Sequence, residues 1–273
     1  MNTTRKGAAV HATGIGVRGP RGWAFRGVDI TAEPGSLIAV EGPSGSGRTC
    51  LLLALTGRMR LAEGSATVAG FPLPKRMGTV RGRTALAHVP GVADLEPALT
   101  VGEHLKEQAL LGRRLANSPA LPWGRRHKEA TRARIDTALA AAGLDPDTLP
   151  KGLRTCVRDL ERLEALRLSI ALAVMQDPHL LAVDDVDLKL SPAERDLAWQ
   201  LLRDLALAGI TVVAAGSDAP ADALIVRTTA APTARPADPA RPADPTPDQD
   251  GPKTTPHTTE EEAAHAFAEA GRA

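Results

Sequence analysis

The sequence predicts an α/β fold built around a phosphate-binding loop, and three observations support this. The chain has 273 residues and is 43% apolar, which is enough for one good-sized hydrophobic core. Strand-like and helix-like segments alternate as far as residue 227, an order that favours parallel strands with helices between them. A glycine-rich loop at residues 42–49 joins a strand-like run to a helix-like run, which is the context that a phosphate-binding loop requires.

The loop follows the apolar run Leu37–Val40, which predicts a buried strand, and precedes the run Cys50–Leu55, which predicts a helix. Its glycines let the backbone turn tightly, so that amide groups and the positive end of the helix can hold an anion. The hydroxyl of Thr49 would contact a magnesium ion. The predicted nucleotide-binding residues are Gly42, Pro43, Ser44, Gly45, Ser46, Gly47, Arg48, Thr49 and Cys50.

Arg48 departs from the loop pattern, which has lysine at this position. Arginine keeps the positive charge, but its planar fork is longer than the compact ammonium that fits between the β- and γ-phosphates. Nucleotide binding can therefore survive where catalysis does not. The alternative interpretation is a glycine-rich turn that holds no ligand.

The middle of the chain, from Leu99 to Glu164, shows no convincing strand pattern. Prolines and a glycine, at Pro119, Pro122, Gly143 and Pro146, interrupt its helix-like segments. We therefore expect a helical insertion in the α/β core, covering about residues 92–164.

A second half of the site is predicted where the apolar run after His179 ends in acidic residues. A phosphate-binding loop needs a carboxylate to organise magnesium, usually at the end of another buried strand. Asp184 is the candidate metal ligand, and Asp185 lies where a general base could reach an attacking water. The alternative is a strand end followed by a solvated acidic turn.

After the strand-like segment Leu224–Arg227, the composition changes to alanine, proline, threonine and aspartate, and the pentapeptide Arg-Pro-Ala-Asp-Pro occurs at 235–239 and again at 241–245. Such a segment has little apolar surface to offset the entropy lost on ordering. We predict one domain at residues 1–227 and a disordered tail at 228–273, with a short helix between Thr258 and Gly271.

Composition excludes several classes of protein. A net charge of +1 argues against nucleic acid as a partner. The two cysteines are far apart and show no metal-binding spacing, which indicates a reducing compartment without disulfides or structural zinc. No apolar stretch is long enough to span a membrane, and the N-terminus does not read as a signal peptide. These features favour a cytoplasmic protein.

Taken together, the loop, the acidic strand end and the segments around them resemble the ATP-binding subunit of ABC transporters. The matching segments, in order, are Glu33–Gly35, Leu99–Leu105, Gln176–Pro178 and Gly209–Val213. The resemblance implies a P-loop NTPase core of ABC type, with a mixed sheet around the loop and an inserted helical subdomain. It also implies ATP and Mg²⁺ as ligands, a membrane-spanning partner subunit, and a place at the inner face of the cell membrane.

The departures from the family pattern concern catalysis. The family's adenine-stacking aromatic would fall between about Val17 and Gly19, and the chain has no tyrosine. The glutamine that contacts magnesium and the attacking water matches Gly91. Asp185 matches the position of the family's catalytic glutamate, and its side chain is one methylene shorter. Ser217 matches the position of the family's switch histidine.

The family's signature, Leu-Ser-Gly-Gly-Gln, matches Leu160-Glu161-Arg162-Leu163-Glu164. In the family, bare glycines at this helix start approach the γ-phosphate held by the facing subunit. Bulky Arg162 and Leu163 are expected to obstruct that approach, and two carboxylates would face a polyphosphate. Trans-binding of ATP through this surface is therefore expected to be lost.

The predicted function is a nucleotide-binding subunit of an ABC transport system that binds Mg-ATP with weak or absent hydrolysis. Two alternatives remain open: a pseudo-ATPase that binds no nucleotide and acts as a regulatory or scaffolding partner, and an active transporter ATPase. Because the signature segment is degenerate, pairing with a different, intact nucleotide-binding subunit is favoured over a homodimer.

Overall fold

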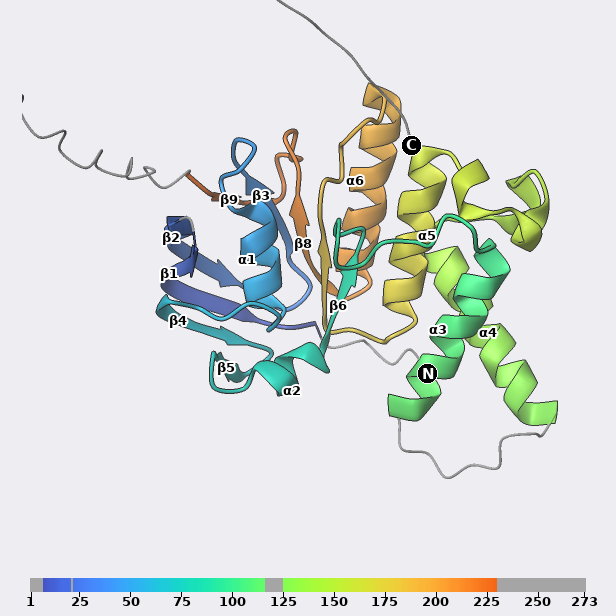
Figure 1. Cartoon of the computed structure of the whole chain (residues 1–273), viewed down its shortest axis with the longest axis horizontal. Coiled ribbons are helices and arrows are strands. Elements are labelled where there is room, and N and C mark those ends of the chain that lie inside the picture. The colour runs from blue at the N-terminus through green and yellow to red at the C-terminus, as the bar shows by residue number, and fades with distance from the viewer. Residues whose placement is uncertain (1–6, 21, 116–124, 230–273) are drawn as a thin grey trace, which may run out of the picture. The chain divides into compact units, whose positions relative to one another are not determined.

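The computed structural model describes residues 7–20, 22–115 and 125–229 (Figure 1). A five-stranded parallel sheet forms its centre, with strand order β6-β7-β8-β3-β9. The strands predicted at 37–40 and 224–227 are both present and lie side by side at one end of this sheet. The five strands are β3 (Leu37–Glu41), β6 (Thr84–Ala87), β7 (Leu180–Val183), β8 (Thr211–Ala215) and β9 (Leu224–Arg227).

A separate four-stranded antiparallel sheet has the order β2-β1-β4-β5. One mixed sheet was expected around the loop, and that expectation was wrong. The strands of the first part of the chain pair with each other as a long hairpin, from Val10 opposite Ala32 to Gly19 opposite Gly22, and so form a sheet of their own. Its strands are β1 (Val10–Gly19), β2 (Gly22–Ala32), β4 (Glu63–Val68) and β5 (Phe71–Leu73).

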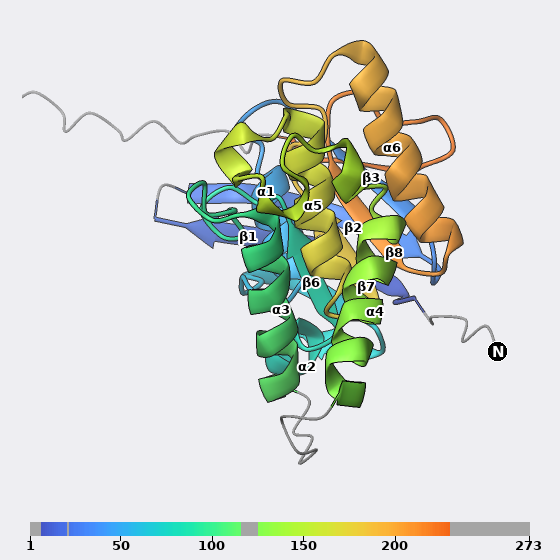
Figure 2. The same cartoon turned by 90° about the vertical axis from the view of Figure 1, so that its right-hand side faces the viewer.

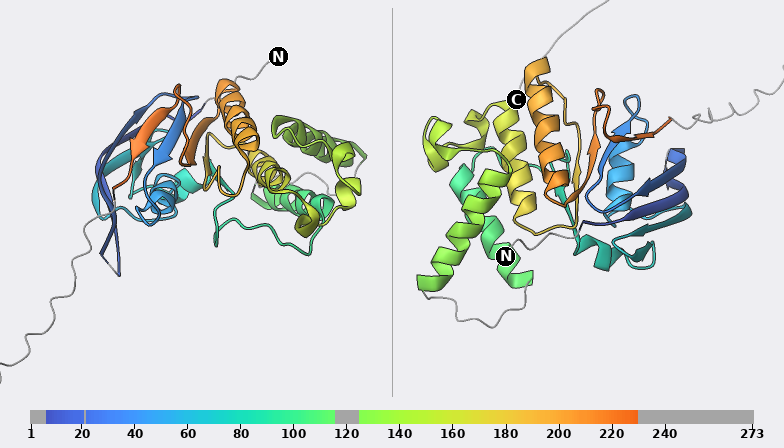
Figure 3. Two further views of the ribbon diagram at one scale, coloured as in Figure 1. Left: turned by 90° about the horizontal axis from the view of Figure 1, so that it is seen from above. Right: turned by 180° about the vertical axis from the view of Figure 1, so that it is seen from behind.

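The strands β6, β7, β8 and β3 of the parallel sheet are buried on both faces, and successive side chains of each strand point to opposite sides. Along β3, Leu37 and Ala39 join a core with the helices α5 and α6, whereas Ile38 and Val40 join a second core with α1 and the antiparallel sheet. Figure 3 shows the two sheets with α1 on one side of the parallel sheet and α5 and α6 on the other. The α/β fold predicted from the alternating segments is confirmed.

Between β6 and α5 the described residues are helical or irregular, apart from one β-bridge that joins Thr100 to Cys156. In this region α3 and α4 lie side by side and pack against α5 (Figure 2). The α-helices are α1 (Arg48–Leu55), α2 (Met77–Arg81), α3 (Val101–Leu115), α4 (Arg125–Ala141), α5 (Arg162–Val174) and α6 (Pro192–Leu207); short 3₁₀ helices cover Pro146–Thr148, Gly152–Arg154 and Val157–Asp159.

The carboxyl ends of β3 and β7 lie on either side of β8 at the same edge of the parallel sheet. Ligands of open α/β sheets bind at this edge. Within the described part of the chain, none of the helices has the length and apolar character needed to cross a membrane. The tail predicted at 228–273, with its repeated pentapeptide and terminal helix, lies outside the described residues beyond Thr229.

Candidate nucleotide-binding site

The phosphate-binding loop connects β3 to α1 in the predicted manner, and α1 begins at Arg48. Gly47, the residue before the helix, has a φ of 87°. A Cβ atom there would lie 2.4 Å from the carbonyl oxygen of Ala24 on β2, so only glycine fits both the conformation and the space. The loop is therefore held closely against β2.

The start of α1 is open to an anion. Its first turn carries no acidic residue, and no side chain caps it. The amides of Gly45, Gly47 and Arg48 donate no hydrogen bond within the described residues. Unsatisfied amide groups and the positive end of the helix dipole together make an anion-binding site.

Ser46 connects the loop to the segment that follows β9. Its hydroxyl is fully buried and lies 2.7 Å from the hydroxyl of Thr228, just after β9. Thr228 in turn donates to the carbonyl oxygen of Glu41 at the end of β3. Thr228, the first residue assigned to the tail by the sequence, is thus buried and tied to the loop.

Asp184 lies opposite the loop, directly after β7, and is 1% exposed. It accepts a hydrogen bond of 2.5 Å from the Thr49 hydroxyl. Burial raises the pKa of the Asp184 carboxyl, an effect that the bond from Thr49 partly opposes. A hydroxyl and a carboxylate side by side are hard oxygen donors, and these suit Mg²⁺ when nucleotide phosphates complete its coordination. The residues present therefore fit a magnesium ion.

Asp185 is held by the loop itself. Its Oδ1 lies 3.5 Å from Nη2 of Arg48, and the two side chains are 28% and 19% exposed. Asp185 has a φ of 45°, in the left-handed region, and its amide donates to Oδ1 of Asp184. The residue proposed as general base thus forms an ion pair with the residue that replaces the loop lysine.

Cys50, the last residue assigned to the loop site, lies in the first turn of α1 and is half-buried. Burial raises the pKa of its thiol, and the negative charge of Asp184 raises it further. The thiol is therefore neutral near pH 7 and adds no charge to the site.

The segment 160–164 differs from the expectation at one residue. Leu163 does not stand at the surface but is buried in the core with 7% exposure, because it lies on the inner face of α5. Glu161 and Glu164 form a capping box at the helix start, each accepting a hydrogen bond from the backbone of the other. The start of α5, unlike that of α1, is closed by carboxylates of its own chain.

Arg162 and His88 form a contact that the sequence did not indicate. Nη2 of Arg162 donates to Nε2 of His88 at 2.8 Å, and Nε of Arg162 donates to the carbonyl oxygen of Leu188. His88 directly follows β6, and its amide donates to the hydroxyl of Ser169. Burial, and then the charge of Arg162, lower the pKa of His88, so the ring is a neutral acceptor. No motif marks a single histidine after an apolar strand.

Ser217, the match to the switch histidine, binds within the chain as well. Its amide and hydroxyl both donate to Oδ2 of Asp187, at 2.5 and 2.6 Å. Gly91, the match to the family glutamine, has a φ of 74° and donates its amide to Asp94. Within the described residues, neither Ser217 nor Gly91 forms a hydrogen bond with the phosphate-binding loop, although both belong to loops at the carboxyl edge of the sheet.

Residues 17–19 include no aromatic side chain, but one lies beside them on the next strand. Trp23 lies opposite Arg18 in the hairpin of β1 and β2. The guanidinium groups of Arg18 and Arg26 lie 5.9 and 4.8 Å from its ring centre. No sequence pattern marks Trp23, because it lies on the second strand and the family resemblance places the aromatic on the first.

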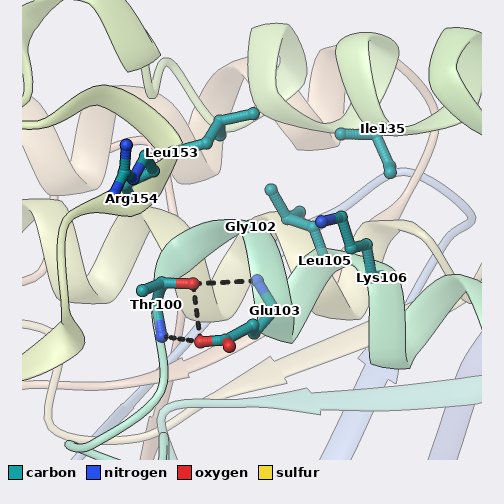
Figure 4. Close-up of a pocket in the computed structure, with 8 residues that line it drawn as sticks. All are labelled: Thr100, Gly102, Glu103, Leu105, Lys106, Ile135, Leu153 and Arg154. Atoms are coloured by element: carbon teal, nitrogen blue, oxygen red, sulfur yellow. Dashed lines mark hydrogen bonds between the residues drawn. The ribbon is translucent and has the colours of Figure 1, made fainter.

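Of the cavities on the helical insertion and at its border, two lie near the residues discussed above. One of about 430 Å³ opens between the start of α3, α4 and the 3₁₀ helix at 152–154, next to the capping pair Thr100 and Glu103 (Figure 4). The other, of about 670 Å³, follows the loop after Gly91 and reaches α5. Its lining residues are His88, Asp94, Leu95, Glu96, Pro97, Val157, Arg158, Leu160, Arg162 and Ala165.

The known proteins that this chain resembles point to a single family. A family model described as ABC transporter matches residues 25–187. The Nod factor export ATP-binding protein I of Cupriavidus metallidurans is 31% identical over 186 residues, which are 68% of this chain and 55% of that protein. The protein of the same name from Rhizobium meliloti strain 1021 is 30% identical, over 69% of this chain and 51% of its own. The chain thus spans about half the length of the curated relatives it matches.

Solved structures share the fold. The dimeric bacterial ABC transporter cassette MJ0796 aligns with a TM-score of 0.62 at 20% identity, covering 81% of this chain and 94% of that one. The cbiO1 protein of Clostridium perfringens, described as part of the ABC transporter complex cbiONQ, aligns with a TM-score of 0.60 at 20% identity. That match covers 77% of this chain and 78% of the other.

Proposed function

The chain belongs to the ABC transporter family, and on that premise we propose that it is a nucleotide-binding subunit of an ABC transport system. The observation that carries the proposal is the open start of α1 facing the Thr49–Asp184 pair. The two parts are far apart in sequence but share one edge of the parallel sheet. Such an edge is where the phosphates and magnesium of a bound nucleotide are held in P-loop proteins.

The proposed ligand is ATP with Mg²⁺. Phosphate oxygens would accept hydrogen bonds from the backbone of the loop from Gly42 to Cys50, and the guanidinium of Arg48 would supply positive charge. Thr49 and Asp184 would hold the magnesium ion, whose chemistry is to bridge phosphate oxygens and neutralise their charge.

Hydrolysis is proposed to be weak or absent. Asp185 is shorter than glutamate, and its carboxylate is already paired with Arg48. A displacement of about 1 Å from the productive position can lower a rate by roughly 100-fold. Gly91 offers no side chain to orient a water molecule.

Two partners are proposed. A helix of a membrane-spanning subunit would seat in the cavity beside the Gly91 loop and the helical insertion, and would place the chain at the inner face of the membrane. A second nucleotide-binding subunit would face the loop. Because Glu161 and Glu164 close the start of α5, this chain offers a partner no open helix start there. A heteromer with an intact subunit therefore completes a site that a homodimer would not.

The test is thermal unfolding of the purified chain with and without millimolar Mg-ATP. Ligand at about 100 times its dissociation constant stabilises the folded state by about 2.7 kcal/mol. The increase in Tm is expected to disappear in Thr49→Ala and in Asp184→Asn. It should persist in the control variants Thr31→Ala and Asp196→Asn, whose side chains are exposed on β2 and α6.

The alternative functions correspond to other outcomes. If the wild-type Tm responds neither to Mg-ATP nor to Mg-ADP, the chain is a scaffold that binds no nucleotide, and the proposal is wrong. Sustained phosphate release that disappears in Asp185→Asn would instead identify an active ATPase and would overturn the proposal of weak turnover.

A further inference from the structure

We infer that this site holds a nucleoside diphosphate more tightly than the corresponding triphosphate, because the Arg48–Asp185 ion pair occupies the place of the terminal phosphate. The inference rests on the proposed function, since it concerns the same nucleotide site. It names the ligand that the site prefers.

The first step concerns the direction of the Arg48 side chain. In a phosphate-binding loop the basic residue at this position reaches the β- and γ-phosphates. Here its Nη2 lies 3.5 Å from the carboxylate of Asp185, at the end of β7 on the opposite side of the site. The guanidinium therefore spans the region beyond the loop where a γ-phosphate would extend.

The second step concerns the position of Asp185, which the backbone determines. Its amide donates to Asp184, and the next amide, that of Val186, donates to the carbonyl oxygen of Ala215 on β8. A residue fixed on both sides in a left-handed conformation cannot swing away at low cost. The carboxylate of Asp185 stays at the mouth of the site.

The third step concerns charge. Magnesium at Thr49 and Asp184 would neutralise one carboxylate, but Asp185 has only Arg48 as an ion-pair partner among the described residues. The nearby Arg162 is engaged with His88 and Leu188. A γ-phosphate would either take Arg48 from Asp185 or face an unscreened carboxylate. A diphosphate can use the open amides of the loop while the ion pair stays intact.

The experiment is isothermal titration calorimetry of the full chain at one free magnesium concentration. It compares the dissociation constants of ADP, ATP and the non-hydrolysable β,γ-imido analogue of ATP. We expect the wild type to bind ADP at least about tenfold more tightly than either triphosphate. In Asp185→Asn this ratio should fall toward one. Asparagine is the replacement of choice because it tolerates the left-handed conformation and removes the charge.

A second variant keeps the test independent of the first. In the double variant R48K/D185N the carboxylate is absent and the shorter ammonium is free for the phosphates, so the ratio should also fall. The matched controls Arg203→Lys and Asp222→Asn alter an exposed ion pair of 2.7 Å on another part of the chain. They should keep the wild-type ratio.

The outcomes separate this inference from the proposed function. Equal or tighter binding of the triphosphates by the wild type overturns the inference and leaves nucleotide binding intact. A preference for ADP that persists in both site variants also overturns it, because the ion pair would not be the cause. Failure of all three nucleotides to bind would overturn the proposed function itself.

Discussion

Arg162 donates a hydrogen bond of 2.8 Å to Nε2 of His88, and this contact ties the start of α5 to the end of β6. Arg162 is thus directed into its own chain. Its Nε donates to the carbonyl oxygen of Leu188 as well. Arg162 and Leu163 consequently take part in the internal packing, and replacing either of them with glycine should have structural consequences.

Leu163→Gly is expected to lower the free energy of unfolding by about 3 to 5 kcal/mol, since it empties a buried leucine site in α5. Arg162→Gly should cost only about 1 kcal/mol, because the Arg162 side chain is partly exposed to solvent and is not part of the core. Urea unfolding of both variants measures the difference. Equal losses would show that Leu163 does not contribute to the core as its position indicates.

Thr228→Val is expected to lower the free energy of unfolding by about 1 to 2 kcal/mol, because it leaves the buried hydroxyl of Ser46 without its partner. It should also weaken nucleotide binding, since Ser46 belongs to the loop. Thr229→Val, at the exposed neighbouring position, is the control. Thermal unfolding with and without nucleotide measures both effects, and identical behaviour of the two variants would contradict the anchoring role of Thr228.

Ser217→Ala should destabilise the protein in a pH-dependent way. Burial raises the pKa of Asp187, but the hydrogen bonds from Ser217 outweigh burial and lower it below its ordinary value. A lowered folded pKa contributes stability that is present above the unfolded pKa of about 3.9 and is lost as the pH falls through the folded value.

The cost of Ser217→Ala is therefore expected to be about 1 kcal/mol near pH 7 and to shrink below about pH 4. Denaturant unfolding at both pH values measures it. Ser65→Ala, an exposed serine on β4, should show no such dependence. A cost that is the same at both pH values would mean that the bond to the ionised carboxylate is not the source.

Gly91→Gln introduces the residue that the family resemblance implies at this position, but it is not expected to raise phosphate release. The φ of Gly91 is 74°, and a glutamine there would cost about 1 to 2 kcal/mol in the left-handed region. Gly78→Gln, in the helical conformation of α2, is the control for stability. A clear gain in turnover by Gly91→Gln would show that the missing side chain alone limits catalysis.

Much of the site could be predicted, because the phosphate-binding loop and the acidic strand end can each be recognised from a short local sequence pattern. The strand at 37–41, the loop and α1 follow one another directly, and Asp184 follows its strand directly. Each pattern needs only neighbours in sequence to be recognised. The division of the strands into two sheets could not be predicted in this way, since strand pairing depends on which hydrogen-bonding edges meet in space.

Local sequence patterns are enough to predict the α/β class, the phosphate-binding loop with arginine in the lysine position, and the pair of carboxylates after a buried strand. The partners of these residues, by contrast, follow from the tertiary structure. It brought together Arg48 with Asp185, Ser46 with Thr228 across 182 residues, and Arg162 with His88 across 74. The physical reason is that hydrogen bonds and ion pairs act over a few ångströms, so partners are chosen by the order of the strands and not by distance along the chain.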